Sequence, residues 1–138
     1  MPYFTSSAEV YELIGGIFSE CLADPELAPK FAASDVTLAL HFTDPAADVL
    51  VDTANSKVFT GDECAAGPTP NVELFMTADV GHEYWLGKVN VSLALAKGQM
   101  RAKGPVPKIL KLVPLTKKVF PRYRSMIEQS GRPHLLGA

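Results

Sequence analysis

The side chains that could carry out acid–base or metal chemistry are few in this chain and lie far apart. His41 is on the polar side of a predicted strand, His82 is in a predicted short helix, and His134 is near the C-terminal end. No HxH, HExxH or CxxC spacing occurs, and no Gly-x-Ser-x-Gly motif marks a nucleophile. The sequence therefore predicts no catalytic residue, no metal site and no cofactor.

Two of the histidines keep an enzyme among the alternatives, because the members of a catalytic triad can come together from distant positions. An enzyme, or an accessory subunit of one, that acts on an apolar substrate needs a polar group of perturbed pKa inside its pocket. His41 and His82 are the candidates for that role.

The two cysteines lie in different contexts. Cys21 falls on the apolar stripe of a predicted helix, and Cys64 lies in a loop rich in Gly and Pro. Neither has a metal-ligating neighbour at short spacing, so we interpret them as a buried thiol and a loop thiol.

The sequence offers little support for nucleotide or nucleic-acid ligands. Gly87-Lys88 is followed by Val89 and not by the Ser or Thr of a phosphate-binding loop. Phe120 and Tyr123 accompany basic residues, but their spacing is that of a helix core and not of a stacking surface on a sheet. We expect no nucleic-acid partner.

Charge is distributed very unevenly along the chain. Residues 1–87 carry a net charge of −12, from two Lys against fourteen Asp and Glu, and residues 88–138 carry +10, from eleven Lys and Arg against Glu128. An anionic partner for the C-terminal part would explain this asymmetry, and so would two parts that face each other across the fold. Both explanations stay open at this point.

A length of 138 residues is that of one domain. No apolar run approaches the roughly 20 residues that cross a membrane. Residues 1–7 lack the features of a signal peptide, and residues 134–138 do not form a Ser-Lys-Leu type of peroxisomal address. We expect a cytoplasmic protein.

The N-terminal part predicts helices. Ser6-x-x-Glu9 is a capping box, and an apolar stripe at helical spacing follows it: Val10, Leu13, Ile14, Ile17, Phe18 and Cys21. A second, short helix is predicted after the turn at Asp24-Pro25-Glu26.

From Val36 the apolar period changes to two, which is typical of half-buried strands. Residues 36–43, 48–53 and 57–61 predict a meander of antiparallel hairpins with one face in solvent. A loop rich in Gly and Pro leads to a fourth strand at 72–77, and a fifth is predicted at 99–103. The pattern predicts an α+β fold with a five-stranded, mostly antiparallel sheet.

Residues 77–104 predict helix, break, helix, break and strand in succession. Asp79 is predicted to cap a short helix that carries Trp85, and Gly87 to end it. Asn90 is predicted to cap a second, apolar helix that Gly98 ends. Two small helices this apolar must cover something, so we interpret the segment as the lid and wall of an apolar pocket.

The same segment resembles one family. Ala78-Asp79, Leu86-Gly87-Lys88 and the run from Ala96 to Gly104 (AKGQMRAKG) are similar to the signature of the sterol carrier protein type-2, or nonspecific lipid-transfer, domain family. The resemblance implies one domain over residues 1–138, with helices packed on one face of the sheet and an apolar tunnel between them. It also implies noncatalytic binding of sterols, fatty acids, acyl-CoA or phospholipids. The chain departs from the family at Pro105, where an acidic residue usually follows the glycine.

Residues 105–130 predict a broken, amphipathic and basic helix. Pro114 and Pro121 each remove a backbone donor, so we expect two or three helical pieces. Basic side chains are predicted along the edges of the apolar arc: Lys108, Lys111, Lys117, Lys118 and Arg122. Such a helix suits an anionic membrane surface. It suits equally well a helix that packs on the sheet while lysine stems cover its margin.

The sequence thus predicts a protein, monomer or homodimer, that is not an enzyme. It predicts binding of a lipid-like ligand, with transfer of that ligand as an open extension. The predicted floor of the pocket consists of apolar residues on the inward side of the strands: Leu38, Leu40, Phe42, Val49, Val51, Leu74, Met76 and Met100. Its predicted walls and mouth are Trp85, Leu86, Leu93, Ile109, Leu112, Phe120 and Met126. Phe75 is predicted on the opposite side of its strand. A structural module whose groove takes a partner helix is a further alternative.

Overall fold

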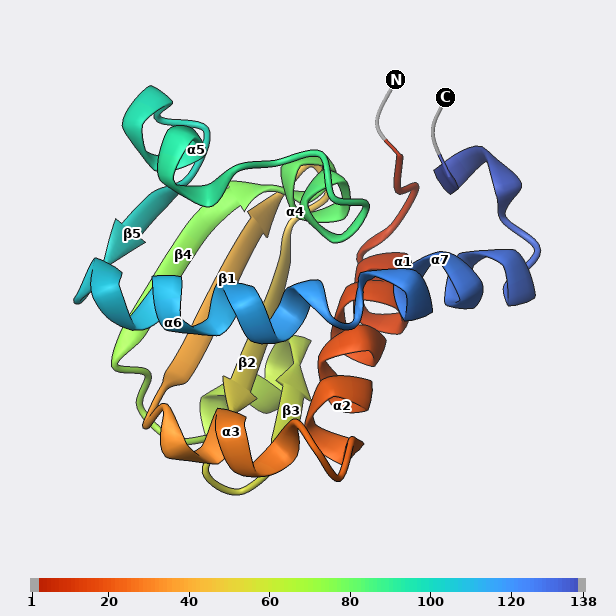
Figure 1. Cartoon of the computed structure of the whole chain (residues 1–138). Coiled ribbons are helices and arrows are strands. Elements are labelled where there is room, and N and C mark those ends of the chain that lie inside the picture. Colours follow the sequence, from red (N-terminus) through yellow and green to blue (C-terminus); the bar gives the residue numbers. More distant parts are fainter. Residues whose placement is uncertain (1–2, 137–138) are drawn as a thin grey trace.

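The computed structural model describes residues 3–136, which form a five-stranded sheet with helices over one of its faces (Figure 1). The strands are β1 (Thr37–Thr43), β2 (Ala47–Asp52), β3 (Lys57–Thr60), β4 (Val72–Thr77) and β5 (Arg101–Lys103), in the order β3-β2-β1-β4-β5. All neighbouring strands are antiparallel except β1 and β4, which are parallel. The predicted α+β fold with a mostly antiparallel sheet is confirmed.

The parallel pair arises from the connection after the meander. β1, β2 and β3 form the predicted hairpins, and a 3-10 helix (Gly61–Ala66) with its Pro-rich continuation then carries the chain back to the other edge of β1. The register pairs Leu40 with Leu74 and Phe42 with Met76. Because side chains alternate along a strand, these pairs place the apolar residues of both strands on one face of the sheet.

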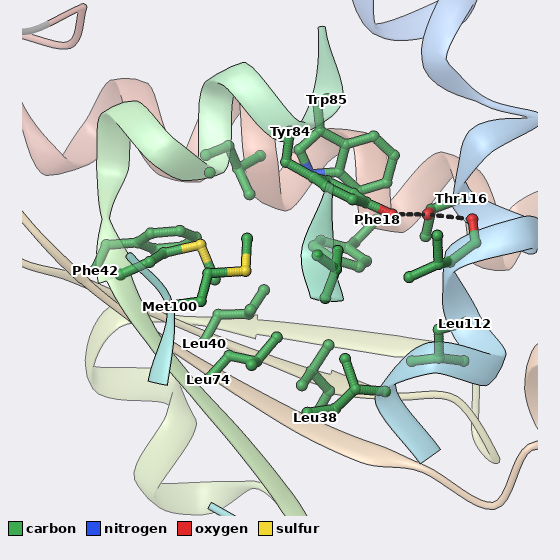
Figure 2. Close-up of a pocket in the computed structure, with 16 residues that line it drawn as sticks. Phe18, Leu38, Leu40, Phe42, Leu74, Tyr84, Trp85, Met100, Leu112 and Thr116 are labelled. Carbon is green, nitrogen blue, oxygen red and sulfur yellow. Dashed lines mark hydrogen bonds between the residues drawn. The ribbon is translucent and has the colours of Figure 1, made fainter. Parts of the chain in front are cut away.

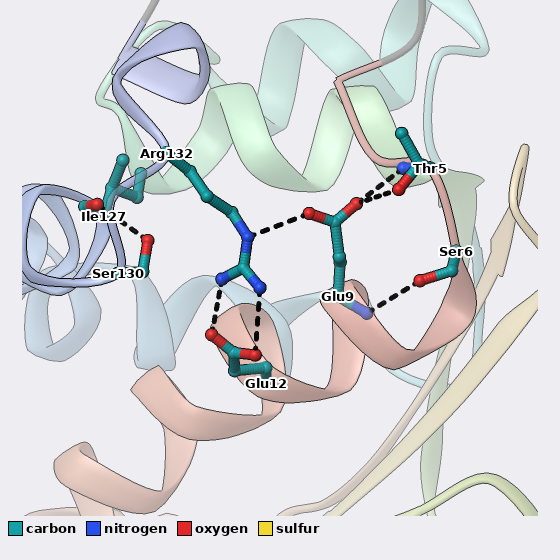
Figure 3. Close-up of polar contacts among 7 residues, drawn as sticks. All are labelled: Thr5, Ser6, Glu9, Glu12, Ile127, Ser130 and Arg132. Atoms are coloured by element: carbon teal, nitrogen blue, oxygen red, sulfur yellow. Dashed lines mark hydrogen bonds and ion pairs between the residues drawn. The ribbon is translucent and has the colours of Figure 1, made fainter.

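The N-terminal helix is continuous over residues 7–23 and consists of α1 (Ser7–Val10), a π-helical turn (Tyr11–Gly15) and α2 (Gly16–Ala23). Its predicted apolar stripe is buried. The Ser6 hydroxyl oxygen accepts a hydrogen bond from the Glu9 N–H at 3.4 Å. The Glu9 carboxylate instead accepts from the N–H and hydroxyl of Thr5, at 2.7 and 2.6 Å (Figure 3).

Gly15 and Gly16, in the middle of this helix, permit close contacts with other elements. A Cβ atom on Gly15 would lie 3.2 Å from Thr60 Cγ2, and one on Gly16 would lie 3.0 Å from Met126 Cε. The N-terminal helix thus packs tightly on β3 on one side and on the C-terminal part of the chain on the other.

Four further helices complete the layer: α3 (Ala28–Ala33), α4 (Ala78–Trp85), α5 (Val91–Lys97) and α6 (Val106–Lys117), with α7 (Phe120–Gln129) and a 3-10 helix (Pro133–Leu136) after them. Asn90 caps α5 through its side chain, and Gly98 ends it with a φ of 78°, as predicted. The prediction for Asp79 was wrong, because Thr77 caps α4. The Asp79 carboxylate instead accepts from the Tyr3 N–H at 2.9 Å.

The C-terminal helix is interrupted once, at Lys118 and Val119 between α6 and α7, and Pro121 is the second residue of α7. Pro114 lies inside α6 and does not break it. It is on the exposed side of the helix, where solvent can satisfy the Leu110 carbonyl group that loses its backbone donor.

Different helices cover the two halves of the sheet. The N-terminal helix lies against β2 and β3, whereas α4 lies against β1 and β4, and α6 lies against β4. Figure 1 shows α6 crossing in front of the sheet, with α4 and α5 at the upper end of the sheet. Among residues 3–136, no helix combines the length and the apolar character that a membrane crossing requires.

Candidate functional site

An apolar cavity lies between the sheet and the helices, over the half of the sheet formed by β1, β4 and β5 (Figure 2). Its volume is about 60 Å³. The lining comes from the N-terminal helix, three strands or their flanks, α4, α5 and α6: Ile14, Phe18, Leu38, Leu40, Phe42, Leu74, Met76, Gly81, Tyr84, Trp85, Val91, Met100, Ile109, Leu112, Val113 and Thr116.

The floor of the cavity follows from strand alternation. Leu38, Leu40 and Phe42 are every second residue of β1, and Leu74 and Met76 are the matching residues of β4. Met100, directly before β5, extends the floor to the edge of the sheet.

Aromatic residues form the roof. Trp85, at the end of α4, is 2% exposed, and Phe18 meets it edge to face with 5.1 Å between ring centroids. Gly81 allows α4 to approach β1 closely, since a Cβ atom there would lie 2.6 Å from Phe42 Cε1. The roof is therefore held by direct contact between α4, the N-terminal helix and the sheet.

One polar pair faces this apolar space. The Tyr84 hydroxyl is hydrogen-bonded to the Thr116 hydroxyl, which donates to the Val113 carbonyl oxygen at 2.9 Å (Figure 2). Burial raises the pKa of Tyr84 to about 12, more than the Thr116 hydrogen bond lowers it, so the phenol is neutral at physiological pH. The pair joins α4 to α6 and carries no charge.

The cavity is small for a lipid. Pockets for drug-sized ligands begin at roughly 300 Å³, several times its volume. A long acyl chain can enter only if lining side chains or a wall helix move outward. Met76 and Met100 suit such movement, because unbranched thioether side chains adapt to irregular shapes.

The structure brings nine of the fifteen predicted pocket residues together around this cavity: Leu38, Leu40, Phe42, Leu74, Met76, Trp85, Met100, Ile109 and Leu112. Whether they bind a ligand stays a prediction. Phe75 is on the other face of the sheet, as expected, and stacks on His41 at 4.8 Å between ring centroids.

Three of the other six residues pack against the N-terminal helix and not around the cavity. Val49 and Val51 point to the same face as Leu38 and Leu40, but β2 lies against the N-terminal helix, which fills that space. The Met126 methyl group packs at Gly16, in the same helix.

The remaining three lie around the end of α4 or on the surface. Phe120 packs edge to face on Tyr84 and Trp85, at 5.3 and 5.8 Å between centroids, behind the roof. Leu86 is buried at the C-terminal end of α4. Leu93 is 52% exposed on the outer side of α5.

Sequence reasoning missed seven lining residues: Ile14, Phe18, Gly81, Tyr84, Val91, Val113 and Thr116. Ile14 and Phe18 belong to the predicted apolar stripe of the first helix, but nothing local indicates which part of the sheet that stripe covers. Thr116 gives no signal at all, because a threonine in a helix is usually a surface residue.

Neither histidine lines the cavity. His41 lies on the outer face of the sheet between two carboxylates, with Nδ1 2.8 Å from Asp48 Oδ1 and Nε2 2.9 Å from Glu73 Oε1. Partial burial lowers its pKa, but the hydrogen bonds to Asp48 and Glu73 outweigh burial, so the pKa is raised. Within residues 3–136, no group of three or more His, Cys, Asp or Glu side chains is arranged so that it could hold a metal ion.

His82 is fully buried on the side of α4 away from the cavity. Its ring nitrogens lie 2.6 Å from the Tyr123 hydroxyl and 2.5 Å from the Leu135 carbonyl oxygen. Tyr3 and Phe4 pack on the ring. Burial lowers the pKa of His82. This histidine thus connects α4 with the segment at Tyr3 and Phe4 and with the C-terminal segment at Tyr123 and Leu135.

The structure divides the predicted basic edge into two groups. Arg122 is ion-paired with Asp24 at 2.5 Å, and Lys108 lies 3.8 Å from Asp35. Both therefore face acidic residues of the N-terminal part. Lys111, Lys117 and Lys118 are exposed and form no ion pair within residues 3–136.

Comparison with protein-family models finds no match for this chain, and comparison with curated protein sequences finds none either. Solved structures do match. A sterol carrier protein 2 domain from Helicoverpa armigera superposes with a TM-score of 0.66 at 14% identity, over 88% of this chain and 95% of that one. Sterol carrier protein 2 from Yarrowia lipolytica, in its apo form, gives 0.61 at 20% identity, over 75% and 87%.

A third match is sterol carrier protein 2 from Aedes aegypti in complex with palmitate, with a TM-score of 0.53 at 19% identity over 80% of this chain and 93% of that one. At these identities the matches show a common fold. They agree with the resemblance of residues 78–104, which the sequence indicated independently. The chain has the fold of the sterol carrier protein 2 domains.

Proposed function

We propose that the protein binds a lipid-like ligand in the apolar cavity and catalyses no reaction. The observation that carries this proposal is an almost entirely apolar cavity between sheet and helices. It is supported by the shared fold, because one protein of that fold is described in complex with the fatty acid palmitate.

The driving force would be the removal of apolar surface from water. Each buried methylene contributes about 0.8 kcal/mol, so a chain of about eight methylenes would gain about 6 kcal/mol. That gain must exceed the cost of moving the cavity wall. A flexible acyl chain can enter as side chains rotate one by one, whereas a rigid sterol needs the whole space at once. Fatty acid, acyl-CoA, sterol and phospholipid are thus ligands to be compared, with acyl chains first.

A noncatalytic role is supported by the chemistry of the lining. The polar side chains that face the cavity are Tyr84 and Thr116, which are hydrogen-bonded to each other and neutral. General acid–base catalysis at neutral pH needs a group whose pKa lies near the working pH. The alternative of an enzyme would need His41 or His82 at the substrate, and both lie outside the cavity lining.

We infer a cytoplasmic location and, as an extension of binding, transfer of the ligand between membranes. The location is supported by the two thiols, since Cys21 and Cys64 are both free and disulfides are rare in reducing compartments. A monomer or a homodimer would serve this function.

The direct test is native mass spectrometry of the purified protein, followed by lipid extraction. We expect a bound mass that disappears on denaturation. Trp85 is the single tryptophan and lines the cavity, so its fluorescence should change on titration with a fatty acid. A ligand-free mass, together with unchanged fluorescence for fatty acids, acyl-CoA, sterols and phospholipids, would contradict the proposal.

A pair of variants at one position separates filling of the cavity from damage to the fold. Leu40→Phe places a larger side chain in the cavity and should weaken fatty-acid binding at least ten-fold, while the melting temperature stays close to wild type. Leu40→Met keeps the volume and should bind normally. Equal binding by both variants would show that the ligand site lies elsewhere.

A further inference from the structure

We propose that the surface formed by α5 and α6 docks on an anionic lipid bilayer. This docking face consists of Leu93 and Lys97 on α5 and of Val106, Leu110, Lys111 and Lys117 on α6. The inference rests on the proposed function, because it names the surface at which the ligand of the cavity would be exchanged.

Exposed apolar side chains gather on these two helices. Leu93, Val106 and Leu110 are 52%, 37% and 39% exposed, and they are the large apolar residues of the described chain that stay open to solvent. Val106 and Leu110 are four residues apart, so they lie on the same side of α6. Side chains of this kind can insert between lipid headgroups.

The docking face is the outer side of the cavity wall. Val91 of α5 and Ile109 and Val113 of α6 line the cavity, and the two helices contact each other. Leu110 follows Ile109 directly and precedes Val113 by one helical turn. A lipid that leaves the cavity between α5 and α6 would therefore emerge at the docking face.

The charge on this surface is positive and without acidic neighbours in the sequence. Between Glu83 and Glu128 the chain contains ten Lys and Arg residues and no Asp or Glu. Lys97, Lys111 and Lys117 are exposed and form no ion pair within residues 3–136. Positive charge beside exposed apolar groups matches an anionic headgroup layer.

The basic residues Arg122, Arg124 and Arg132, in α7 and directly after it, are bound to other parts of the fold. Arg122 pairs with Asp24, and Arg124 donates to the Leu86 carbonyl oxygen at 3.0 Å. Arg132 binds the carboxylates of Glu9 and Glu12, at 3.0 and 2.5 Å (Figure 3). These arginines hold the C-terminal part on the fold, so they are less available to anionic lipid than the lysines of the docking face.

Charge also favours a bilayer over a second copy of the chain. A symmetric dimer through the docking face would bring lysines of both copies together, and like charges placed opposite each other oppose association. An acidic partner protein would be the remaining occupant if the chain failed to bind vesicles that contain an anionic lipid.

The experiment measures sedimentation of the full chain with phosphatidylcholine vesicles, with and without phosphatidylserine. We expect binding only to the vesicles that contain phosphatidylserine, and release at high salt. Each lysine near such a surface accounts for about a five-fold change in partitioning. Lys111→Glu with Lys117→Glu should therefore lower binding by at least about 25-fold.

Two further variants sharpen the result. Lys30→Glu with Lys57→Glu makes the same charge change on α3 and β3, where both lysines are exposed, and should lower binding much less. Leu93→Ser with Leu110→Ser should lower binding without removing its salt dependence. Circular dichroism of each variant verifies that it is folded.

A separate titration with a dissolved, short-chain fluorescent fatty acid tests the cavity without any bilayer. If the fatty acid binds but wild-type protein ignores anionic vesicles, the docking face is refuted while the proposed function stands. If vesicles bind but no ligand does, the proposed function fails and docking stands. Equal loss of vesicle binding in the Lys111/Lys117 and Lys30/Lys57 variants would also overturn the inference, as would a dimer that Leu93→Ser with Leu110→Ser dissociates.

Discussion

At the scale of single residues, His82 makes the fold sensitive to acid. Burial lowers the pKa of its ring in the folded chain, so on acidification the unfolded chain takes up the proton first, near the ordinary value of about 6.5. The free energy of unfolding should therefore fall as the pH drops below about 6.5 towards the lower folded-state value. His82→Gln should cost about 1–3 kcal/mol at neutral pH, because the bonds to Tyr123 and Leu135 are lost or distorted. Urea unfolding between pH 5 and pH 8 (about the titration range of His) measures both effects.

His41 provides the matched control, because its pKa is shifted in the opposite direction. Its raised pKa means that the contribution of the protonated ring is complete below about 6.5 and is lost as the pH rises through the folded-state value. The ring is partly exposed, so the contribution should be no more than about 1 kcal/mol. If His82→Gln loses stability on acidification as steeply as wild type does, another group is responsible.

At the scale of secondary structure elements, two helical glycines should respond differently to alanine. Alanine gains about 1 kcal/mol over glycine inside a helix. In Gly81→Ala, the new Cβ would lie 2.6 Å from the Phe42 ring, which is held in the core, so we expect a net loss of about 1–3 kcal/mol. In Gly16→Ala, the Cβ would meet the end of the Met126 side chain at 3.0 Å, and a methionine can move aside. Thermal unfolding should show Gly16→Ala at or above wild-type stability.

If Gly81→Ala were more stable than Gly16→Ala, the result would contradict the packing described for α4. It would mean that α4 can shift away from β1 at little cost. In that case Gly81→Ala should also enlarge the cavity and strengthen ligand binding, which a Trp85 titration would detect.

At the scale of the whole molecule, the uneven charge distribution has two explanations that apply to different elements. α7 and Arg132 face the acidic N-terminal part through ion pairs with Asp24, Glu9 and Glu12. Lys97 of α5 and Lys111 and Lys117 of α6 are exposed to solvent, whereas Lys108 of α6 lies near Asp35. One part of the basic segment thus holds the fold together through ion pairs, and another part is exposed and available to a partner.

Ligand binding should stabilise the molecule as a whole. A ligand that binds only the folded chain adds about 2.7 kcal/mol when its free concentration is about 100 times its Kd. Protein freed of co-purified lipid should therefore melt at a lower temperature than protein as isolated, and added fatty acid should restore the difference. Leu40→Phe serves as the control, because it should show neither change. A melting temperature that is insensitive to lipid removal and addition would contradict binding inside the core.

Features of this protein that depend on local periodicity could be predicted from its amino-acid sequence. The period of two predicted which side of each strand points inward, including Leu38, Leu40 and Leu74 inside and Phe75 outside. Helical spacing predicted the buried stripe of the N-terminal helix, and cap residues predicted the bounds of α5. These features depend on residues that are close together in the sequence, so they can be predicted from the sequence.

The position of the cavity, in contrast, follows only from the way the helices pack on the sheet. Val49 and Leu40 have the same pattern and the same orientation, yet one is covered by the N-terminal helix and the other faces the cavity. Tertiary packing also decides which basic residues are paired and that His82 joins distant segments. Each of these outcomes depends on contacts between elements that are far apart in the sequence. A local sequence pattern contains no information about such contacts.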